Sequence, residues 1–248
     1  MAIKDFSKGI LTAPAAHEGH VAFDDGQVGL GPEPTLTFII SGVPFIEPLG
    51  YRLAKRIFDI VVALSAIILL GPLLLIVCVL IYLDDRGPIL YRQWRVGRHG
   101  EPIPFYKFRS MCLDADKIRE QLLAQSDAKG GAFKMKNDPR ITKIGKFTRK
   151  FSIDEMPQLF CVLSGYMTIV GPRPLPLSEG YKCEGSQRIR YLVKPGLVCF
   201  REIGGRSLLT FGEWMDLDEK YVRTRSFRTD LSIFIRLIPA VISAKGAF

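Results

Sequence analysis

Residues 60–83 read IVVALSAIILLGPLLLIVCVLIYL, a run of twenty-four residues without a charge. A straight helix of this length would be about 36 Å long, and the hydrocarbon core of a bilayer is roughly 30 Å thick. By length alone, the simplest interpretation is therefore a single membrane-spanning helix.

Two features of this segment favour a different course. Gly71-Pro72 lies near its middle, where proline removes a helical hydrogen bond and kinks the axis, so each half would be only about 16–18 Å long. Basic residues also stand on both sides: Arg52, Lys55 and Arg56 before it; Arg86, Arg92, Arg95 and Arg98 after it. Because basic flanks favour the cytoplasmic side, both ends are expected there. The sequence thus predicts a re-entrant helix over residues 49–86 that enters one leaflet, breaks at Pro72 and returns.

Charge is distributed unevenly along the chain. The 248 residues carry a formal net charge of +9, but residues 1–50 hold two lysines against six carboxylates, so the positive excess lies in the rest. A basic body suits anionic lipids, phosphorylated substrates or nucleic acid. The five cysteines lack CxxC spacing and favour a reducing compartment over disulfides or zinc.

Proline, glycine and apolar spacing divide the rest of the chain. Residues 1–48 are rich in proline and glycine, which predicts a flexible tail. Residues 89–97 and 103–111 are predicted as two strands of a hairpin, with the turn at 99–102. The expected fold class is α/β, mainly helical with this small β-hairpin, and residues 87–248 are expected to form a cytosolic catalytic domain.

Three further segments are predicted to be helical. Residues 114–125 carry apolar side chains at helical spacing. Residues 141–150 are basic and amphipathic, and residues 231–244 are apolar but too short to span a bilayer. The last two segments fit interfacial amphipathic helices, and equally helices that pack on the body.

Two adjacent carboxylates, Asp154 and Glu155, stand in the stretch FSIDEMPQL at residues 151–159. Ser152 followed by Glu155 matches a capping box, so a purely structural role in the first turn of a helix is one interpretation. A reactive role is compatible with it, because a helix N-terminus keeps a carboxylate ionised, as a nucleophilic aspartate requires. Neighbouring residues point about 100° apart on a helix, so the two carboxylates can take different roles.

Fixed cations that suit a phosphate occur at two other places. Lys107 and Arg109 alternate along the second predicted strand, which puts them on one face and lets both converge on one site. Arg173 lies in Gly171-Pro172-Arg173-Pro174, a turn stiffened by two prolines, and its guanidinium suits bidentate phosphate binding. An exposed basic strand face and an ordinary surface turn are the structural alternatives.

The proline-broken apolar segment, the KFRSM strand, the Asp-Glu pair and the Gly-Pro-Arg-Pro turn occur together in a characteristic order. In this combination the chain resembles the bacterial sugar transferases, in their small membrane-bound form, from about Tyr51 to the C-terminus. The resemblance implies a monotopic enzyme on the cytoplasmic face of a bacterial inner membrane, surrounded by its lipids. Such an enzyme moves a hexose-1-phosphate from UDP-glucose or UDP-galactose to undecaprenyl phosphate and so initiates exopolysaccharide synthesis. The stretch Gly212-Glu213-Trp214-Met215 resembles the glucose-transferring members.

The resemblance also implies roles for individual residues. Asp154 would be the nucleophile that attacks the β-phosphate, expels UMP and forms a covalent phosphosugar intermediate. Glu155 would act as a base or position the acceptor phosphate. Mg²⁺ is the expected cofactor, with Asp154 as its contact on the protein. The remaining roles fall on cations and one proline: phosphate or nucleotide binding by Lys107, Arg109, Arg173 and Arg206, lipid-phosphate contact or simple anchoring of the helix by Lys55 and Arg56, and the re-entrant turn at Pro72.

One stretch departs from the family pattern. Residues 197–203 read LVCFREI where relatives have Thr, Trp and Gln. This departure motivates an alternative hypothesis, a catalytically silent membrane scaffold of a polysaccharide assembly complex. A basic nucleic-acid binder is a third hypothesis, but the uncharged segment at 60–83 argues against it, so no nucleic-acid partner is expected. The oligomeric state stays open, a homodimer included.

Overall fold

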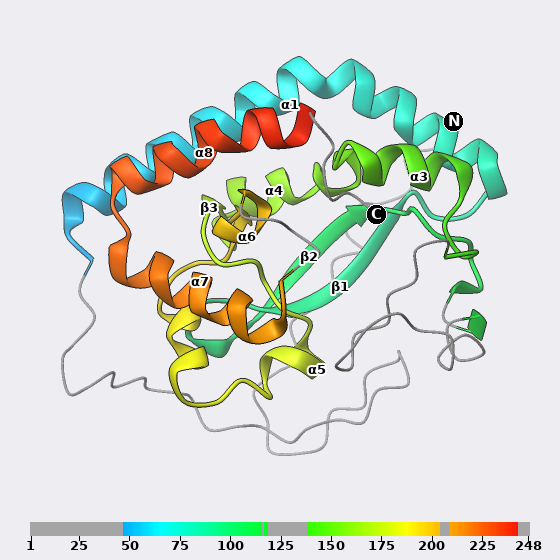
Figure 1. The fold of residues 1–248 in the computed structure, drawn as a ribbon. Helices are drawn as coiled ribbons and strands as arrows, with labels where there is room; N and C mark the ends of the chain where they lie inside the picture. The colour runs from blue at the N-terminus through cyan, green and yellow to red at the C-terminus, as the bar shows by residue number, and fades with distance from the viewer. Residues whose placement is uncertain (1–46, 116, 119–137, 204–208, 243–248) are drawn as a thin grey trace.

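The computed structural model describes residues 47–115, 117–118, 138–203 and 209–242 (Figure 1). The predicted tail at 1–48, apart from its last two residues, lies outside these ranges. So do most of the predicted helix at 114–125 and Arg206.

A long apolar helix, α1 (Leu49–Asp85), arches over one side of the body (Figure 1). By length and composition it could cross a membrane, and only 11% of its most apolar stretch is buried inside the protein. Its bounds agree with the predicted range of 49–86, but the helix continues through Pro72. The predicted break at Pro72 is therefore not confirmed. A proline inside a helix removes one hydrogen bond and bends the axis, and it need not end the helix.

Both halves of α1 pack on the same body. In the first half, Phe58 makes edge-to-face contacts with Phe227 and Phe234 of α8 (Phe227–Ile242), which runs alongside α1 in Figure 1. In the second half, buried Val77 and Ile81 belong to one apolar cluster with Phe108. Between the halves, the side chains are largely exposed to the surroundings, as for Ile68 and Leu69.

The predicted hairpin is confirmed. Strands β1 (Leu90–Val96) and β2 (Pro102–Phe108) pair antiparallel, with the short 3₁₀ turn η2 (Arg98–Gly100) between them. Along β2, Ile103 and Phe105 are buried on one face of the strand, and Phe108 is buried on the other face, as predicted, in the cluster with Val77 and Ile81 of α1. Lys107 therefore lies on the face opposite to Phe108, the face that it shares with Ile103 and Phe105.

Short elements complete the fold around a second, parallel strand pair. In this pair, β3 (Thr168–Val170) lies beside β4 (Gly196–Val198). The remaining elements are α3 (Lys143–Lys150), η4 (Ile153–Glu155), α4 (Gln158–Leu163), α5 (Leu177–Gly180), η5 (Gly185–Leu192), α6 (Phe200–Ile203) and α7 (Phe211–Thr224). The fold is thus mainly helical with small sheets, as predicted.

Two of the predicted amphipathic helices are present. Helix α3 begins after Thr142, whose hydroxyl accepts a hydrogen bond from the Gly145 N–H at 2.9 Å, and its Phe147 is about half exposed. Helix α8 packs Ile233 into the main core, so it is at least in part a helix of the body. That either helix lies at a membrane surface stays a prediction.

Candidate active site

The carboxylate pair lies on an abrupt turn after α3. Ser152 adopts a left-handed backbone conformation, with φ of 57°, that ends α3 and redirects the chain into η4. The Ser152 side chain makes no capping hydrogen bond, and α4 begins only at Gln158. The predicted capping box is therefore wrong, because residues 153–155 form a single 3₁₀ turn and not the first turn of an α-helix. A left-handed residue other than glycine carries strain of about 1–3 kcal/mol, and such residues cluster at functional sites.

Glu155 is held by two cations from separate elements. Lys107 Nζ on β2 donates to Glu155 Oε1 at 2.7 Å, and Arg173 Nη1 donates to Oε2 at 2.9 Å. Arg173 Nη2 donates to Oε1 as well, which makes a bidentate pair. Burial alone would raise the pKa of Glu155, but the charges of Arg173 and Lys107 outweigh it and hold that pKa well below its usual range. Glu155 is thus fixed as an ionised side chain.

Asp154 lies next to Glu155 in the chain, but its carboxylate has a different environment. Its carboxylate is buried, and Lys107 Nζ stands 3.7 Å from Oδ2, which is beyond hydrogen-bonding distance. Among the described residues, none donates a hydrogen bond to the Asp154 side chain. Burial raises the pKa of Asp154; the positive charge of Lys107 only partly offsets this, and the negative charge of Glu155 adds to it. The two neighbours therefore have distinct environments, which suits different roles, although no helix N-terminus keeps Asp154 ionised.

The structure brings Lys107 to the carboxylates but not Arg109. The Arg109 guanidinium forms an ion pair with Asp85 at the end of α1 and donates from Nη2 to the Ile81 carbonyl at 3.3 Å. The predicted convergence of Lys107 and Arg109 is wrong, because β2 ends at Phe108 and the strand alternation ends with it. Arg109 instead fastens the end of α1 to the hairpin.

The turn that carries Arg173 is built on close backbone contact. The Gly171 N–H donates to the Val198 carbonyl at 2.9 Å, and the Gly196 N–H donates to the Pro172 carbonyl at 2.8 Å. A Cβ on Gly196 would stand 2.1 Å from the Gly171 nitrogen, so only glycine fits there. The Gly-Pro-Arg-Pro turn is thereby fixed against Lys194-Pro195-Gly196, and this fixes Arg173.

Two further arginines hold the same turn, and sequence reasoning assigned neither of them a role at this site. Arg190 donates to the Arg173 carbonyl and pairs with Asp218 through an Nη2–Oδ2 contact of 3.1 Å. Arg95 Nη1 donates to the Pro174 carbonyl at 2.8 Å. Burial raises the pKa of Asp218 to about 6, against the opposing charge of Arg190. No local motif marks Arg190, because its partners stand 17 and 28 residues away in the chain.

Gln158 is a third residue that sequence reasoning missed. It lies one turn after Asp154, is fully buried, and neither its Oε1 nor its Nε2 has a hydrogen-bond partner among the described residues. Buried polar groups without a partner are rare in native proteins because each is costly. The segment 151–159 contained this signal, since glutamine follows a proline within an otherwise apolar turn.

The stretch that departs from the family pattern borders the same site. Glu202 Oε1 stands 3.6 Å from Arg173 Nη1, and the Arg201 guanidinium lies over the Trp214 ring, 4.2 Å from its centroid. Glu202 thus lies next to Arg173 despite the departure.

Lys55 and Arg56 are directed into the protein. Lys55 Nζ donates to Asp230 Oδ2 and to the Val170 carbonyl, both at 2.8 Å. Arg56 donates to the carbonyls of Val162 and Leu163, each at 2.7 Å. The predicted lipid-phosphate contact by these two residues is therefore not supported. The last carbonyls of α4 lack partners within that helix, and Arg56 supplies their donors.

Asp154 is the carboxylate of the pair that could hold a metal ion. No three His, Cys, Asp or Glu side chains gather into a protein-only metal site in the part of the chain that the structure describes. Both Glu155 oxygens are engaged by Lys107 and Arg173, which leaves Asp154 as the available ligand. Mg²⁺ commonly binds through one or two carboxylates and keeps waters and substrate phosphates as its other ligands.

Comparison with known proteins identifies the class. The family model described as bacterial sugar transferase matches residues 50–244, from the start of α1 to beyond the end of α8. The chain therefore belongs to the bacterial sugar transferase family, as its motifs predicted.

Three relatives illustrate the similarity. Galactosyl transferase CpsE of Streptococcus agalactiae is 41% identical over 199 residues, 80% of this chain and 44% of the relative. The UDP-glucose:undecaprenyl-phosphate glucose-1-phosphate transferase of Escherichia coli is 36% identical over 210 residues, 78% of this chain and 42% of the relative. The exopolysaccharide production protein ExoY of Sinorhizobium fredii is 34% identical over 218 residues, 86% of this chain and 96% of the relative. The chain thus spans less than half the length of the first two relatives and nearly all of ExoY.

Proposed function

We propose that the protein transfers a hexose-1-phosphate from a UDP-sugar to undecaprenyl phosphate, releases UMP and so begins exopolysaccharide synthesis at a membrane. The observation that carries the proposal is the contrast between adjacent carboxylates: Glu155 is saturated by Lys107 and Arg173, whereas Asp154 accepts no hydrogen bond from the described residues. The E. coli relative is named for such a transfer from UDP-glucose, and ExoY is named for exopolysaccharide production.

The reaction proceeds in two displacements at one phosphorus atom. An Asp154 oxygen attacks the β-phosphorus of the UDP-sugar; a new P–O bond forms, the bond to the bridging oxygen breaks, and UMP leaves with the electron pair. An oxygen of undecaprenyl phosphate then attacks the same phosphorus and releases Asp154 as a carboxylate. Lys107 lies between the two carboxylates. Its positive charge is therefore placed to stabilise the negative charge that develops on the sugar phosphate.

Glu155 serves as a positioning residue in this scheme and not as a base. Its pKa is held well below the usual range, and a carboxylate of low pKa is a poor proton acceptor at neutral pH. Its bidentate bond instead orients Arg173 toward incoming phosphate oxygens. Mg²⁺ bound at Asp154 would supply neutralisation of the diphosphate charge.

A re-entrant, monotopic course of α1 on the cytoplasmic face is part of the proposal. It is supported by the attachment of both ends of α1 to one body, through Arg56 near the start and the Asp85–Arg109 pair at the end. A straight spanning helix would carry its ends to opposite sides of the bilayer. Cysteines introduced at positions 50 and 90 should react with an impermeant reagent from the same side. Labelling from opposite sides would refute the re-entrant course.

The deciding experiment measures UMP release by the purified protein in detergent, with Mg²⁺, undecaprenyl phosphate and a panel of UDP-sugars. We expect release with one donor, loss of release with EDTA, and loss with Asp154→Asn in a folded protein. The panel also selects between glucose and galactose, since relatives are named for each. If no donor binds and no UMP appears, the protein is instead a silent scaffold, for which the altered stretch at 197–203 is the motivation.

A further inference from the structure

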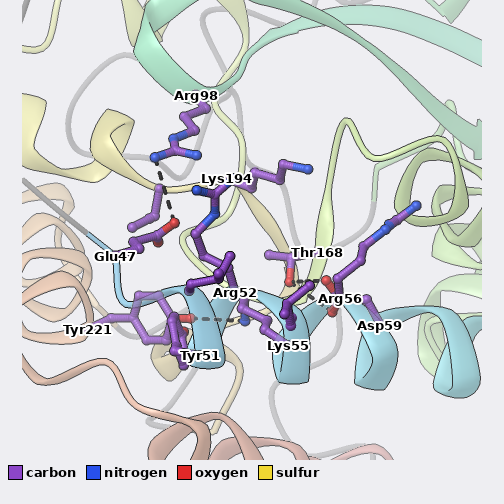
Figure 2. A pocket seen from close by; sticks show the side chains of 13 residues that line it. Glu47, Tyr51, Arg52, Lys55, Arg56, Asp59, Arg98, Thr168, Lys194 and Tyr221 are labelled. Carbon is purple, nitrogen blue, oxygen red and sulfur yellow. Dashed lines mark hydrogen bonds and ion pairs between the residues drawn. The ribbon is translucent and has the colours of Figure 1, made fainter.

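A cavity of about 360 Å³ lies between the first turns of α1, η2 and the residues just before β4 (Figure 2). Its lining includes Arg52, Arg98 and Lys194. Neither the carboxylates Asp154 and Glu155 nor the cations that face them line this cavity. It is therefore a separate feature of the fold, close to the point where α1 begins.

The lining of this cavity is strongly basic. Among the described residues it holds five cations and two carboxylates: Arg52, Lys55, Arg56, Arg98 and Lys194, against Glu47 and Asp59. A concave surface lined with one sign of charge concentrates ligands of the opposite sign.

The two carboxylates offset only part of this charge. Asp59 is buried and accepts the Ile169 N–H and the Thr168 hydroxyl, each at 2.8 Å. Glu47 is shared between Arg98, at 3.7 Å, and Arg225, at 3.5 Å. Glu47 therefore pairs with one cation of the lining, Arg98, and divides its charge with an arginine outside the cavity.

Arg52 and Lys194 are the cations without a partner: neither makes a hydrogen bond or ion pair with any residue that the structure describes. Figure 2 shows Arg52 extending from α1 toward Arg98 and Lys194. On the other side, Lys194 Nζ and Arg56 Nη2 lie 3.6 and 3.9 Å from the point where a Cβ on Gly165 would stand. Arg52 and Lys194 thus add positive charge to the lining that no ion pair among the described residues offsets. Burial lowers the pKa of Lys194, and the neighbouring charge of Arg56 lowers it further.

We propose that this cavity is a second anion site, which binds a phosphate group through Arg52, Arg98 and Lys194. A phosphate offers several strong acceptor oxygens and would relieve the repulsion among these cations. Two sources have this chemistry, the headgroup of an anionic phospholipid and a free phosphate. The exposed side chains of Leu49 and Leu53 also line the cavity, so a lipid could reach it from the apolar face of α1. The inference is independent of the proposed sugar-phosphate transfer.

The test is the rate at which Lys194 is acetylated, followed by mass spectrometry of the full-length protein. One arm titrates inorganic phosphate into protein in neutral detergent at constant ionic strength. The other compares nanodiscs of phosphatidylcholine with nanodiscs that also contain phosphatidylglycerol. At a tenfold excess of ligand over its dissociation constant, only about a tenth of the sites stay free, so acetylation of Lys194 should slow about tenfold. Lys182 is exposed and does not line the cavity, so its rate serves as the internal control.

The arms identify the source of the phosphate. Protection by phosphatidylglycerol alone indicates a lipid headgroup; protection by inorganic phosphate alone indicates a free phosphate, and protection by both indicates that the phosphate group itself is recognised. Each of these supports the site. An unchanged Lys194 rate in both arms overturns it.

Variants separate this site from the one at Asp154. Arg52→Gln should weaken protection of Lys194 about tenfold, because a hydrogen bond to a charged group is lost. The matched variant Lys182→Gln should leave protection unchanged. Asp154→Asn should retain protection of Lys194 even if it abolishes UMP release. The anion site and the proposed sugar-phosphate transfer can therefore be refuted independently of each other. If Lys107→Gln removes protection as fully as Arg52→Gln does, the effect is transmitted from the Asp154 site and the proposal is wrong.

Discussion

Two lysine–carboxylate clusters in this protein are built from the same groups and differ in how fully they are bonded. Asp230 accepts hydrogen bonds from Lys55 at 2.8 Å, Tyr51 at 2.9 Å and Tyr221 at 2.7 Å. Asp154 is also buried, but no described residue donates a hydrogen bond to it, and Lys107 stands 3.7 Å away. A buried carboxylate with all its partners ties elements together, whereas one left without hydrogen bonds retains oxygens that can react. The first cluster docks α1, and the second is the candidate reaction centre.

The largest expected effect is on turnover. Asp154→Asn should lower UMP release about 10⁴-fold or more, since loss of a covalent nucleophile leaves only binding and electrostatic contributions. The matched control is Asp216→Asn, at an exposed position of α7, which should release UMP at the parent rate. Comparable turnover by Asp154→Asn and Asp216→Asn would remove the distinction between the two clusters.

The second largest expected effect is on the stability of the protein, and it concerns the cluster around Asp230. Asp230→Asn should cost about 3 kcal/mol, because it leaves Lys55 without its buried counter-charge. Tyr51→Phe removes one hydrogen bond from the same carboxylate and should cost only about 1 kcal/mol. Thermal unfolding in detergent measures both. A greater loss for Tyr51→Phe than for Asp230→Asn would show that the ion pair is not what fastens α1.

The pH dependence of the first displacement should report Asp154. Its pKa is raised by burial, and attack requires the ionised form, so UMP release in a single turnover without acceptor lipid should decline on acidification before an ordinary aspartate would protonate. Lys107 has the largest lowering influence on this pKa, so Lys107→Gln should move the acidic limb to still higher pH. An acidic limb that does not move in this variant would assign the titration to another group.

The smallest expected effect is a gain in the stability of the folded protein. Because the folded-state pKa of Asp154 is raised, the folded protein binds this proton more tightly than the unfolded chain, and ionisation at neutral pH favours unfolding. Asp154→Asn should therefore stabilise the protein by about 1 kcal/mol at pH 7, and the gain should vanish below the usual aspartate pKa. Unfolding midpoints at pH 7 and at acid pH measure it. A loss of stability at pH 7 would mean that attraction to Lys107 outweighs the cost of burial.

Local patterns predicted the parts of this molecule that depend on local physics. Alternation predicted the hairpin and the inward Phe108, and the uncharged run with its basic flanks predicted a helical segment over 49–86, close to the observed bounds of α1. Each follows from a period or a turn that a few neighbouring residues determine.

The misses share a different cause. Arg109 was assigned by strand alternation, but its partner Asp85 stands 24 residues earlier in the chain, and tertiary pairing decided its direction. Ser152 fits a capping box by residue type, but its backbone is left-handed and residues 153–155 form a 3₁₀ turn, which the residue types alone did not indicate. Lys55 and Arg56 resemble the basic flank of a membrane segment, but both point into the protein. Lys55 donates to a carbonyl of β3, and Arg56 donates to carbonyls of α4.

The packing of α1 on the body determines how much of the chain must fold together. Ala63 belongs to the main core, and Val77 and Ile81 form a second cluster with Phe108, one residue from Lys107. The boundary at residues 86 and 87 therefore divides the sequence without dividing the core. A water-soluble fragment that begins at residue 87 would lose the wall against which β2 and α4 close. Folding of the reaction centre therefore requires α1, and a chain in which α1 has not packed on the body has no finished site.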